Sequence, residues 1–141
     1  MNVNFKSMVN VSQVICKGMV ERRKGGAVVN VSSVGSKVAS SERLAYGSSK
    51  AAMDQATRVM ALELGPHKIR VNAVNPTLVW TDIARIHWTD PEKVARVKSR
   101  IPLGEIPEVD DVANAVLFLL SDKAAFINGT TLPVDGGRLS C

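Results

Sequence analysis

The chain of 141 residues has few cysteines, few aromatic residues and no long apolar run. Its two cysteines, Cys16 and Cys141, stand far apart and show no metal-ligand spacing, so neither a metal site nor a disulfide framework is expected. The longest wholly apolar run, Ala115–Leu120, has only six residues, whereas a membrane-spanning helix needs about 20. With no recognisable secretory signal, these absences favour a cytoplasmic location, no membrane partner and two free thiols.

The chain also lacks a concentrated charge of one sign. Lys and Arg number 18 against 13 Asp and Glu, which gives a net charge of +5, but the basic residues are mostly scattered. The one tight run, Glu21–Lys24, falls where a predicted helix ends, and cations there complement the helix dipole. No basic face is interleaved with aromatic residues, so nucleic acid is not expected as a partner.

The hydrophobic pattern indicates alternating helices and strands. Helical spacing of apolar residues predicts helices over residues 2–24, 42–64 and 109–120, and a short one beginning near residue 90 inside an otherwise irregular segment, 77–107. Short β-branched runs predict strands over residues 27–31, 69–74 and 130–134. This order predicts one α/β domain with a parallel sheet and right-handed crossovers.

Tyr46 and Lys50 are the first candidates for chemistry. Because they are four residues apart in a predicted helix, they share one face of it. A lysine ammonium beside a phenol favours the phenolate, so Tyr46 could act as an acid or a base. The alternative is a lysine that simply extends along a solvated helix face.

Ser33 could join this pair. It follows the predicted strand 27–31, and Asn75-Pro76 ends the next strand along the chain. Ligands of open parallel sheets bind beyond the carboxyl ends of the strands, so Ser33, Tyr46 and Lys50 could converge on one ligand. Otherwise Ser33 merely caps the turn after the strand.

Four ordered motifs resemble the short-chain dehydrogenase/reductase family, and the resemblance covers essentially the whole chain. They are Val29–Ser33, Tyr46–Lys50, Ile69–Pro76 and Leu132–Gly137. Three further stretches resemble the NADPH-dependent carbonyl and dicarbonyl reductases within that family: Met60–Thr77, Ile101–Gly104 and Cys141. The resemblance implies a Rossmann-type doubly wound sheet, and reduction of a ketose or an α-dicarbonyl compound by hydride transfer from NADPH.

The resemblance also implies residue roles. Tyr46 would protonate the substrate oxygen, Ser33 would hold that oxygen, and Lys50 would bind the nicotinamide ribose. Asn4 would hold a water in the proton relay, unless it is an ordinary surface residue. Pro76, Val79 and Thr81 would contact the cofactor, and the substrate contacts would be Ser33, Val34, Arg43 and Trp88. As alternatives, Val79 and Thr81 could be ordinary loop residues and Trp88 a packing anchor.

The glycine-rich G-x-G-x-x-G loop that cradles a dinucleotide pyrophosphate does not occur in the sequence. The family places that loop, with its first three strands, before the position equivalent to Met1. The chain is therefore expected to be the C-terminal portion of the sheet without its first βαβ units, a single incomplete domain at 1–141 that holds the catalytic and substrate-binding half. Because it lacks the loop that binds the cofactor pyrophosphate, the isolated chain is expected to have little activity. The strand 27–31 should lie at a sheet edge.

The resemblance further implies a homo-oligomer formed through the helices 2–24 and 42–64. The alternative function is non-catalytic: a shortened isoform that associates with full-length reductase subunits. A third interpretation is an incomplete gene model, in which the missing half of the domain is encoded upstream.

Overall fold

The computed structural model describes residues 1–141 as an α/β structure whose helices and strands alternate along the chain. A π-helical turn, Asn2–Lys6, leads directly into the first helix. The helices are α1 (Ser7–Arg22), α2 (Leu44–Leu64), α3 (Asp82–His87), α4 (Pro91–Lys98) and α5 (Val109–Leu120), and the strands are β1 (Gly26–Val31), β2 (Ile69–Pro76) and β3 (Thr131–Val134). This order confirms the predicted α/β class.

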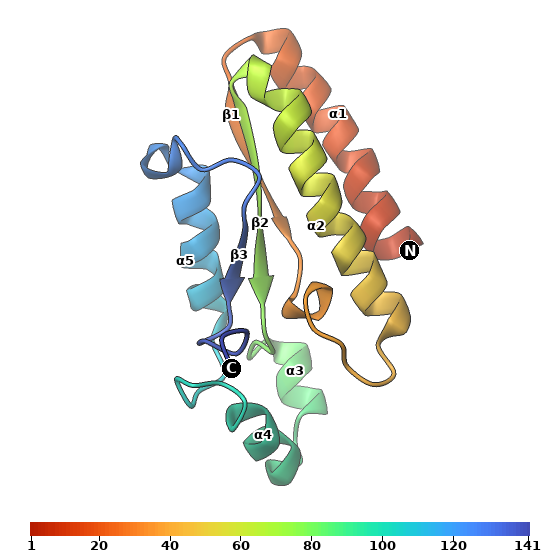
Figure 1. The fold of residues 1–141 in the computed structure, drawn as a ribbon, viewed down its shortest axis with the longest axis vertical. Coiled ribbons are helices and arrows are strands. Elements are labelled where there is room, and N and C mark those ends of the chain that lie inside the picture. Colours follow the sequence, from red (N-terminus) through yellow and green to blue (C-terminus); the bar gives the residue numbers. More distant parts are fainter.

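The three strands form one parallel sheet in the order β1-β2-β3 (Figure 1). The register pairs Val28 with Val71 and Val74 with Leu132. Every residue of the central strand β2 is buried except Arg70, which is half-buried. A strand buried in this way needs cover on both faces of the sheet, and the helices supply it.

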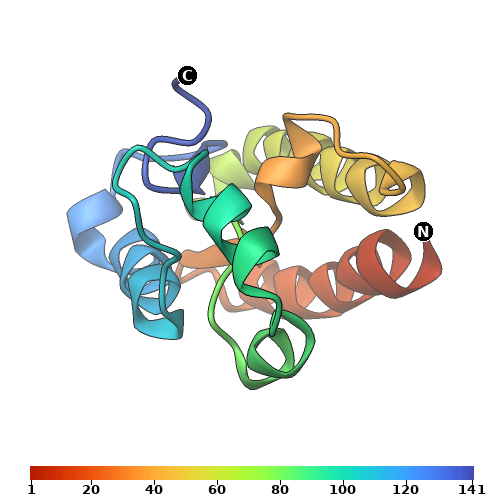
Figure 2. The same cartoon turned by 90° about the horizontal axis from the view of Figure 1, so that it is seen from below.

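The helices form one layer on each side of the sheet. α1 and α2 lie side by side on one face, and α5 lies on the other (Figures 1 and 2). Because side chains alternate along a strand, Ile69 and Val71 pack with Ala61 of α2, whereas Val74 packs with Leu119 of α5. Two small cores therefore share the central strand.

Buried amides tie the strands to their neighbours. The Asn72 side chain donates to the carbonyl oxygen of Ile127 at 2.9 Å, and its Oδ1 accepts from the N–H of Thr130 at 3.0 Å. In β1, Asn30 donates to Thr57 Oγ1 of α2 at 2.9 Å. A buried amide costs free energy unless it is hydrogen-bonded, so these pairings help to select the observed positions of β3 and α2.

The structure differs from the predicted elements in the segment 77–107, which contains two short helices rather than one. The additional helix, α3, has six residues, which is too short to show a periodic apolar pattern. Thr81 begins it by accepting a hydrogen bond from the N–H of Ala84. α2 also begins two residues later than predicted, at Leu44, because Glu42 has a left-handed φ of 62°.

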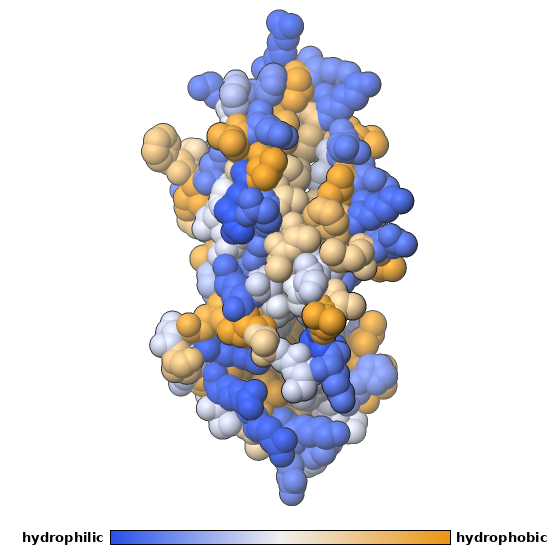
Figure 3. Space-filling view, turned by 45° about the vertical axis from the view of Figure 1, so that its right-hand side comes forward, coloured by the Kyte–Doolittle hydropathy of each residue, from blue (hydrophilic) through white to orange (hydrophobic).

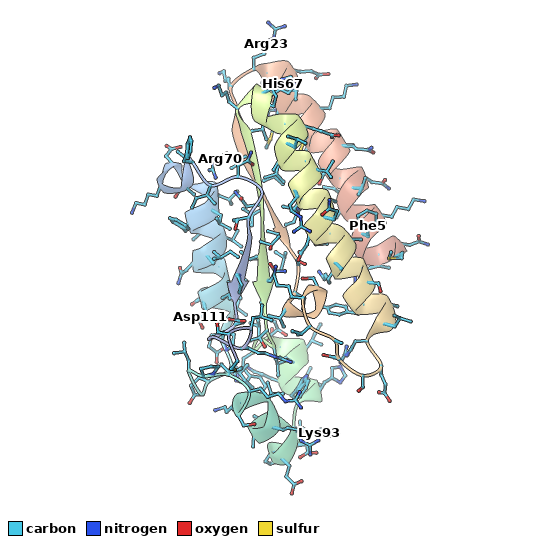
Figure 4. All side chains as sticks on the ribbon, in the orientation of Figure 1. Phe5, Arg23, His67, Arg70, Lys93 and Asp111 are labelled. Atoms are coloured by element: carbon cyan, nitrogen blue, oxygen red, sulfur yellow. The ribbon has the colours of Figure 1, made fainter.

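The two ends of the sheet carry different elements. α3 and α4 lie beyond the carboxyl ends of the strands, at the lower end of the molecule in Figure 1. Arg23 and His67 lie at the opposite end, far from Lys93 (Figure 4). β1 lies at an edge of the sheet, as predicted for residues 27–31. None of the helices combines the length and the apolar character that crossing a membrane requires.

Arg70 joins the start of β2 to the C-terminal end of α5 (Figure 4). Its guanidinium donates to the carbonyl oxygens of Leu119 at 2.7 Å and Ser121 at 3.1 Å, with longer hydrogen bonds to Leu120 and Ile127. Carbonyl groups at a helix C-terminus lack partners within the helix, and a cation there also complements the helix dipole. Arg70 therefore caps α5 from the sheet.

We predict that Arg70→Met lowers the free energy of unfolding by about 1.5–3 kcal/mol, because hydrogen bonds from a charged donor are lost and their acceptors stay partly buried. Urea unfolding followed by circular dichroism measures this change in the free energy of unfolding. The matched control is Arg58→Met, which removes an exposed guanidinium that bonds only to Gln55 and should change stability by less than about 0.5 kcal/mol. Equal effects of the two substitutions would contradict the capping role.

Candidate active site

A cleft of about 1030 Å³ opens at the carboxyl ends of β1 and β2. Its walls come from the turn after β1, the start of α2, the loop after β2, and the helices α3 and α4. Hydrophilic and hydrophobic side chains are both exposed around this lower end of the molecule (Figure 3). In open parallel sheets this end is where ligands bind.

Ser33 enters the cleft from the end of β1. It begins the 3₁₀ turn Val34–Ser36, and its Oγ accepts from the N–H of Gly35 at 3.1 Å, which leaves the hydroxyl hydrogen free to donate. A Cβ placed on Gly35 would lie 3.4 Å from Ser33 Oγ and 3.4 Å from Cε1 of Tyr46. Ser33 and Tyr46 therefore border the same glycine, although they are 13 residues apart in the sequence.

Lys50 lies one helical turn after Tyr46 in α2. Its Nζ is 5.9 Å from the centroid of the Tyr46 ring and donates to the carbonyl oxygen of Val31 at 2.8 Å. Burial lowers the pKa of Lys50, and the attraction of the Asp54 carboxylate opposes this shift. The amine is thus held near the phenol ring, while the Tyr46 side chain remains exposed.

Asn4 reaches α2 close to Tyr46. Its amide donates to Ser49 Oγ at 3.0 Å, and the Ser49 hydroxyl donates to the carbonyl oxygen of Tyr46 at 2.7 Å. Ser49 is buried. These two hydrogen bonds hold the start of the chain against the helical turn that carries Tyr46.

A buried carboxylate supports the turn that carries Ser33. Asp54 Oδ2 accepts from the amide of Asn75 at 3.0 Å and lies 2.6 Å from Ser36 Oγ. Ser36 Oγ is also 2.7 Å from the carbonyl oxygen of Ser33, so its single hydrogen is shared between two acceptors. The Asn75 amide donates to the same carbonyl at 3.0 Å. Asp54 therefore ties α2, β2 and the turn together.

Asp54 was not among the residues predicted from the sequence, although its position carries a signal. It follows Lys50 by four residues and Tyr46 by eight. In a helix this spacing places all three on one face, so Asp54 should accompany the other two. The partners Ser36 and Asn75 carry no such signal, because only the folded chain brings them to α2.

The structure distributes the other predicted residues between the cleft wall and its surroundings. The wall includes the predicted substrate contacts Val34, Arg43 and Trp88, and the predicted cofactor contacts Val79 and Thr81. Three predicted residues do not line it: Asn4, Lys50 and Pro76, the last of which is buried at the end of β2. The wall also includes Arg100 and Arg138, which no motif in the sequence points out.

The wall has features that fit a nicotinamide group. Gly47, Ser48 and Ala51 are small, so they leave room for a flat ring beside α2. The N–H of Val79 forms no hydrogen bond within the chain, so it is free to donate to a carboxamide. Thr81 Oγ1 accepts from a backbone N–H, which leaves its own hydrogen available to an oxygen of a ligand.

Comparison with known proteins identifies related oxidoreductases along nearly the whole chain. A family model described as enoyl-(acyl carrier protein) reductase matches residues 1–138. The chain is 54% identical to D-erythrulose reductase of Gallus gallus over 138 residues and 52% identical to L-xylulose reductase of Mus musculus over 139 residues. These alignments cover 98% and 99% of this chain, but only 56% and 57% of the relatives. The chain therefore spans little more than half the length of the curated relatives it matches.

Solved structures share the fold. The gluconate 5-dehydrogenase of Burkholderia cenocepacia J2315, solved with NADP and tartrate, has a TM-score of 0.95 at 31% identity, and the match covers 100% of this chain and 55% of that one. A 4-hydroxyisoleucine dehydrogenase solved with NADH also has a TM-score of 0.95 at 31% identity, over 99% of this chain and 58% of that one. Each of these two proteins was solved with a nicotinamide cofactor.

We predict that Asp54→Asn lowers the free energy of unfolding by about 1–3 kcal/mol, because an amide cannot accept at both positions where the carboxylate does and leaves a buried donor unpaired. Urea unfolding measures it. The matched control on the same helix, Glu63→Gln, changes an exposed side chain and should shift stability by less than about 0.5 kcal/mol. A fully stable Asp54→Asn protein would show that the turn after β1 does not depend on this carboxylate.

Lys50 should make stability depend on pH. Because its pKa is lowered in the folded state, the folded protein binds fewer protons than the unfolded chain between that lowered pKa and the ordinary value of 10.5. The free energy of unfolding therefore gains a contribution that rises with pH across this window. We predict that Lys50→Met removes it, so that stability rises less with pH than in the parent protein. Urea unfolding at a series of alkaline pH values tests this, with the exposed Lys17→Met as a control that keeps the parent slope.

Proposed function

Because this chain belongs to the short-chain dehydrogenase/reductase family, we propose that it takes part in the NADPH-dependent reduction of a small carbonyl compound, either a ketose or an α-dicarbonyl. The family match confirms the resemblance that the sequence motifs indicated. The observation that carries the proposal is that Ser33 and Tyr46 border the same glycine, with the Lys50 amine 5.9 Å from the phenol ring. Relatives named L-xylulose reductase and carbonyl reductase [NADPH] 2 support it.

In the proposed reaction Tyr46 is the general acid. Its hydroxyl donates a proton to the carbonyl oxygen of the substrate as negative charge develops there, and the free hydrogen of Ser33 Oγ binds the same oxygen. The Lys50 ammonium stabilises the phenolate that remains, because an opposite charge nearby favours the ionised form. Asn4, held through Ser49 beside the Tyr46 turn, would position a water that returns a proton to the phenolate.

The cofactor and the substrate would occupy the cleft together. When bound, the nicotinamide supplies the hydride that reduces the carbonyl carbon. The residues proposed to hold this cofactor are Tyr46, Lys50, Pro76, Val79 and Thr81, of which Lys50 and Pro76 are not among the residues that line the cleft. The residues proposed to contact the substrate, in addition to Ser33, are Val34, Arg43 and Trp88. In this proposal residues 1–141 form the catalytic and substrate-binding part of one short-chain dehydrogenase/reductase domain.

The surface of α1 and α2 favours assembly. Val11, Val14 and Ile15 of α1 and Leu62 of α2 are exposed apolar residues. Burying such residues against another subunit removes apolar surface from water, so a homo-oligomer formed through these helices is proposed. The same surface favours a second candidate function, in which the chain carries out no catalysis of its own and associates with other reductase subunits.

We predict that Tyr46→Phe lowers the rate of carbonyl-dependent NADPH oxidation by about 100-fold or more, since general acid catalysis contributes on the order of 10²–10⁴-fold. The assay uses 2,3-butanedione and L-xylulose as substrates. The Tyr46 hydroxyl forms no hydrogen bond within the chain, and no other position in the sequence is a tyrosine. The variant should therefore unfold at the same urea concentration as the parent, and the loss of rate reports on the chemistry alone.

Two results would contradict the catalytic proposal. Turnover that persists at the parent rate in Tyr46→Phe would exclude the acid role. Absence of turnover by the parent chain, together with its co-purification with an L-xylulose reductase subunit, would favour the non-catalytic candidate. A charged substitution on the exposed face of α1, Val14→Glu, should then abolish the co-purification, whereas Phe126→Glu, at an exposed apolar residue outside both helices, should not.

A further inference from the structure

The cleft carries more positive than negative charge. Its wall contains Lys37, Arg43, Arg100 and Arg138, whereas the one acidic residue in it is Glu42. Only Lys37 among these cations has a carboxylate nearby, since its Nζ lies 4.0 Å from Asp54 and also donates to Thr131. The guanidinium groups of the three arginines take part in none of the ion pairs of the chain.

Three of the acidic residues at this end of the molecule are already bound to other groups, and the other two in α3 and α4, Asp82 and Glu92, do not line the cleft. Glu105 pairs with Lys98 at 2.7 Å, and Glu108 pairs with Arg85 at 2.6 Å. Asp90 accepts hydrogen bonds from backbone N–H groups at the start of α4. These acids therefore do not neutralise the arginines of the cleft.

Arg138 is the most firmly placed of the three arginines. Its guanidinium donates to Thr77 Oγ1 at 2.9 Å, and Thr77 is buried at the end of β2. The nearby Asp135 carboxylate accepts from the N–H groups of Gly137 at 3.0 Å and Leu139 at 2.9 Å. Asp135 therefore shapes the turn that carries Arg138 without pairing with its charge, and the guanidinium keeps free donors toward the cleft.

A guanidinium with free donors binds carboxylates and other oxyanions well. Three of them in one cleft wall, with Glu42 as its single acidic residue, favour a ligand that brings its own negative charge. We propose that the carbonyl substrate of this site carries an anionic group, in the simplest case a carboxylate, which Arg43, Arg100 and Arg138 bind while the carbonyl group lies at Tyr46. This inference rests on the proposed function and narrows its substrate class from small carbonyl compounds in general to those that carry a negative charge.

The phosphates of the cofactor are a second source of negative charge for these arginines. The two sources differ in what they change. If the arginines serve the substrate, removing them lowers the preference for charged over neutral carbonyl compounds and leaves the affinity for NADPH as it was. If the arginines bind the cofactor phosphates instead, removing them lowers the affinity for NADPH and leaves the preference between charged and neutral carbonyl compounds unchanged.

The test uses two pairs of compounds that match in shape and differ in charge. Pyruvate is compared with 2,3-butanedione, and 4-oxopentanoate with 2,5-hexanedione. Binding of each is measured by ligand-observed nuclear magnetic resonance, which needs no turnover, and reduction is measured as NADPH oxidation. The variants are Arg43→Gln, Arg100→Gln and Arg138→Gln, singly and together, and the matched control is Arg96→Gln on α4, which is exposed and does not line the cleft.

We expect the anionic member of at least one pair to bind on the order of tenfold more tightly at low salt, since one exposed charge pair contributes up to about fivefold and more than one arginine can contact the anion. The preference should shrink at high salt and disappear in the triple variant, while Arg96→Gln retains it. Equal binding of charged and neutral members would overturn the inference, even where both are reduced and the proposed reductase function holds. A preference for the anion without reduction of any compound would instead contradict the reductase function and leave the anionic site standing.

Discussion

The hydrogen bonds of the buried Asp54 carboxylate are the constraint on which the arrangement of the site depends. They join three segments that are distant in the sequence, since Ser36 follows β1, Asp54 belongs to α2 and Asn75 ends β2. A carboxylate buried in this way is stable only while its donors are present, and the donors also hold the backbone carbonyl of Ser33. The position of Ser33 relative to Tyr46 therefore depends on Asp54 and Asn75, which do not line the cleft, and on Ser36, which does.

The central strand β2 can hold the Asp54 network because its two faces contact different parts of the molecule. Ile69, Val71 and Asn75 point to α2, and the last of them replaces an apolar contact with the link to Asp54. Arg70, Asn72 and Val74 point to α5 and the segment before β3. Alternation along one strand therefore separates an apolar core near its start from a polar network at its carboxyl end. The network lies where an open sheet binds ligands.

Most of the fold could be predicted from the sequence, because long periodic segments such as residues 42–64 and β-branched runs such as 69–74 carry strong local signals. The helix α3 could not, since six residues stabilised by the Thr81 cap show no period. For the site, the sequence predicted two features, the Tyr46–Lys50 spacing and the place of Ser33 after a strand. Ser36, Asn75, Arg100 and Arg138 were not, because their contacts join residues that only the folded sheet and the two short helices bring together.

The site residues that the sequence predicts differ in their physical role from those that only the structure reveals. Tyr46 and Lys50 lie on one long helix, where the spacing alone determines their separation, so their proximity can be predicted from the sequence. The charge of the cleft comes instead from side chains on a loop, on the turn after α4 and on the turn after β3. Such positions can change without disturbing the buried hydrogen bonds around Asp54. In the proposed function, the helix and the sheet would therefore constrain the reaction, whereas surface segments would determine the choice of substrate. For this reason the arginines of the cleft bear on the proposed substrate class rather than on the proposed chemistry.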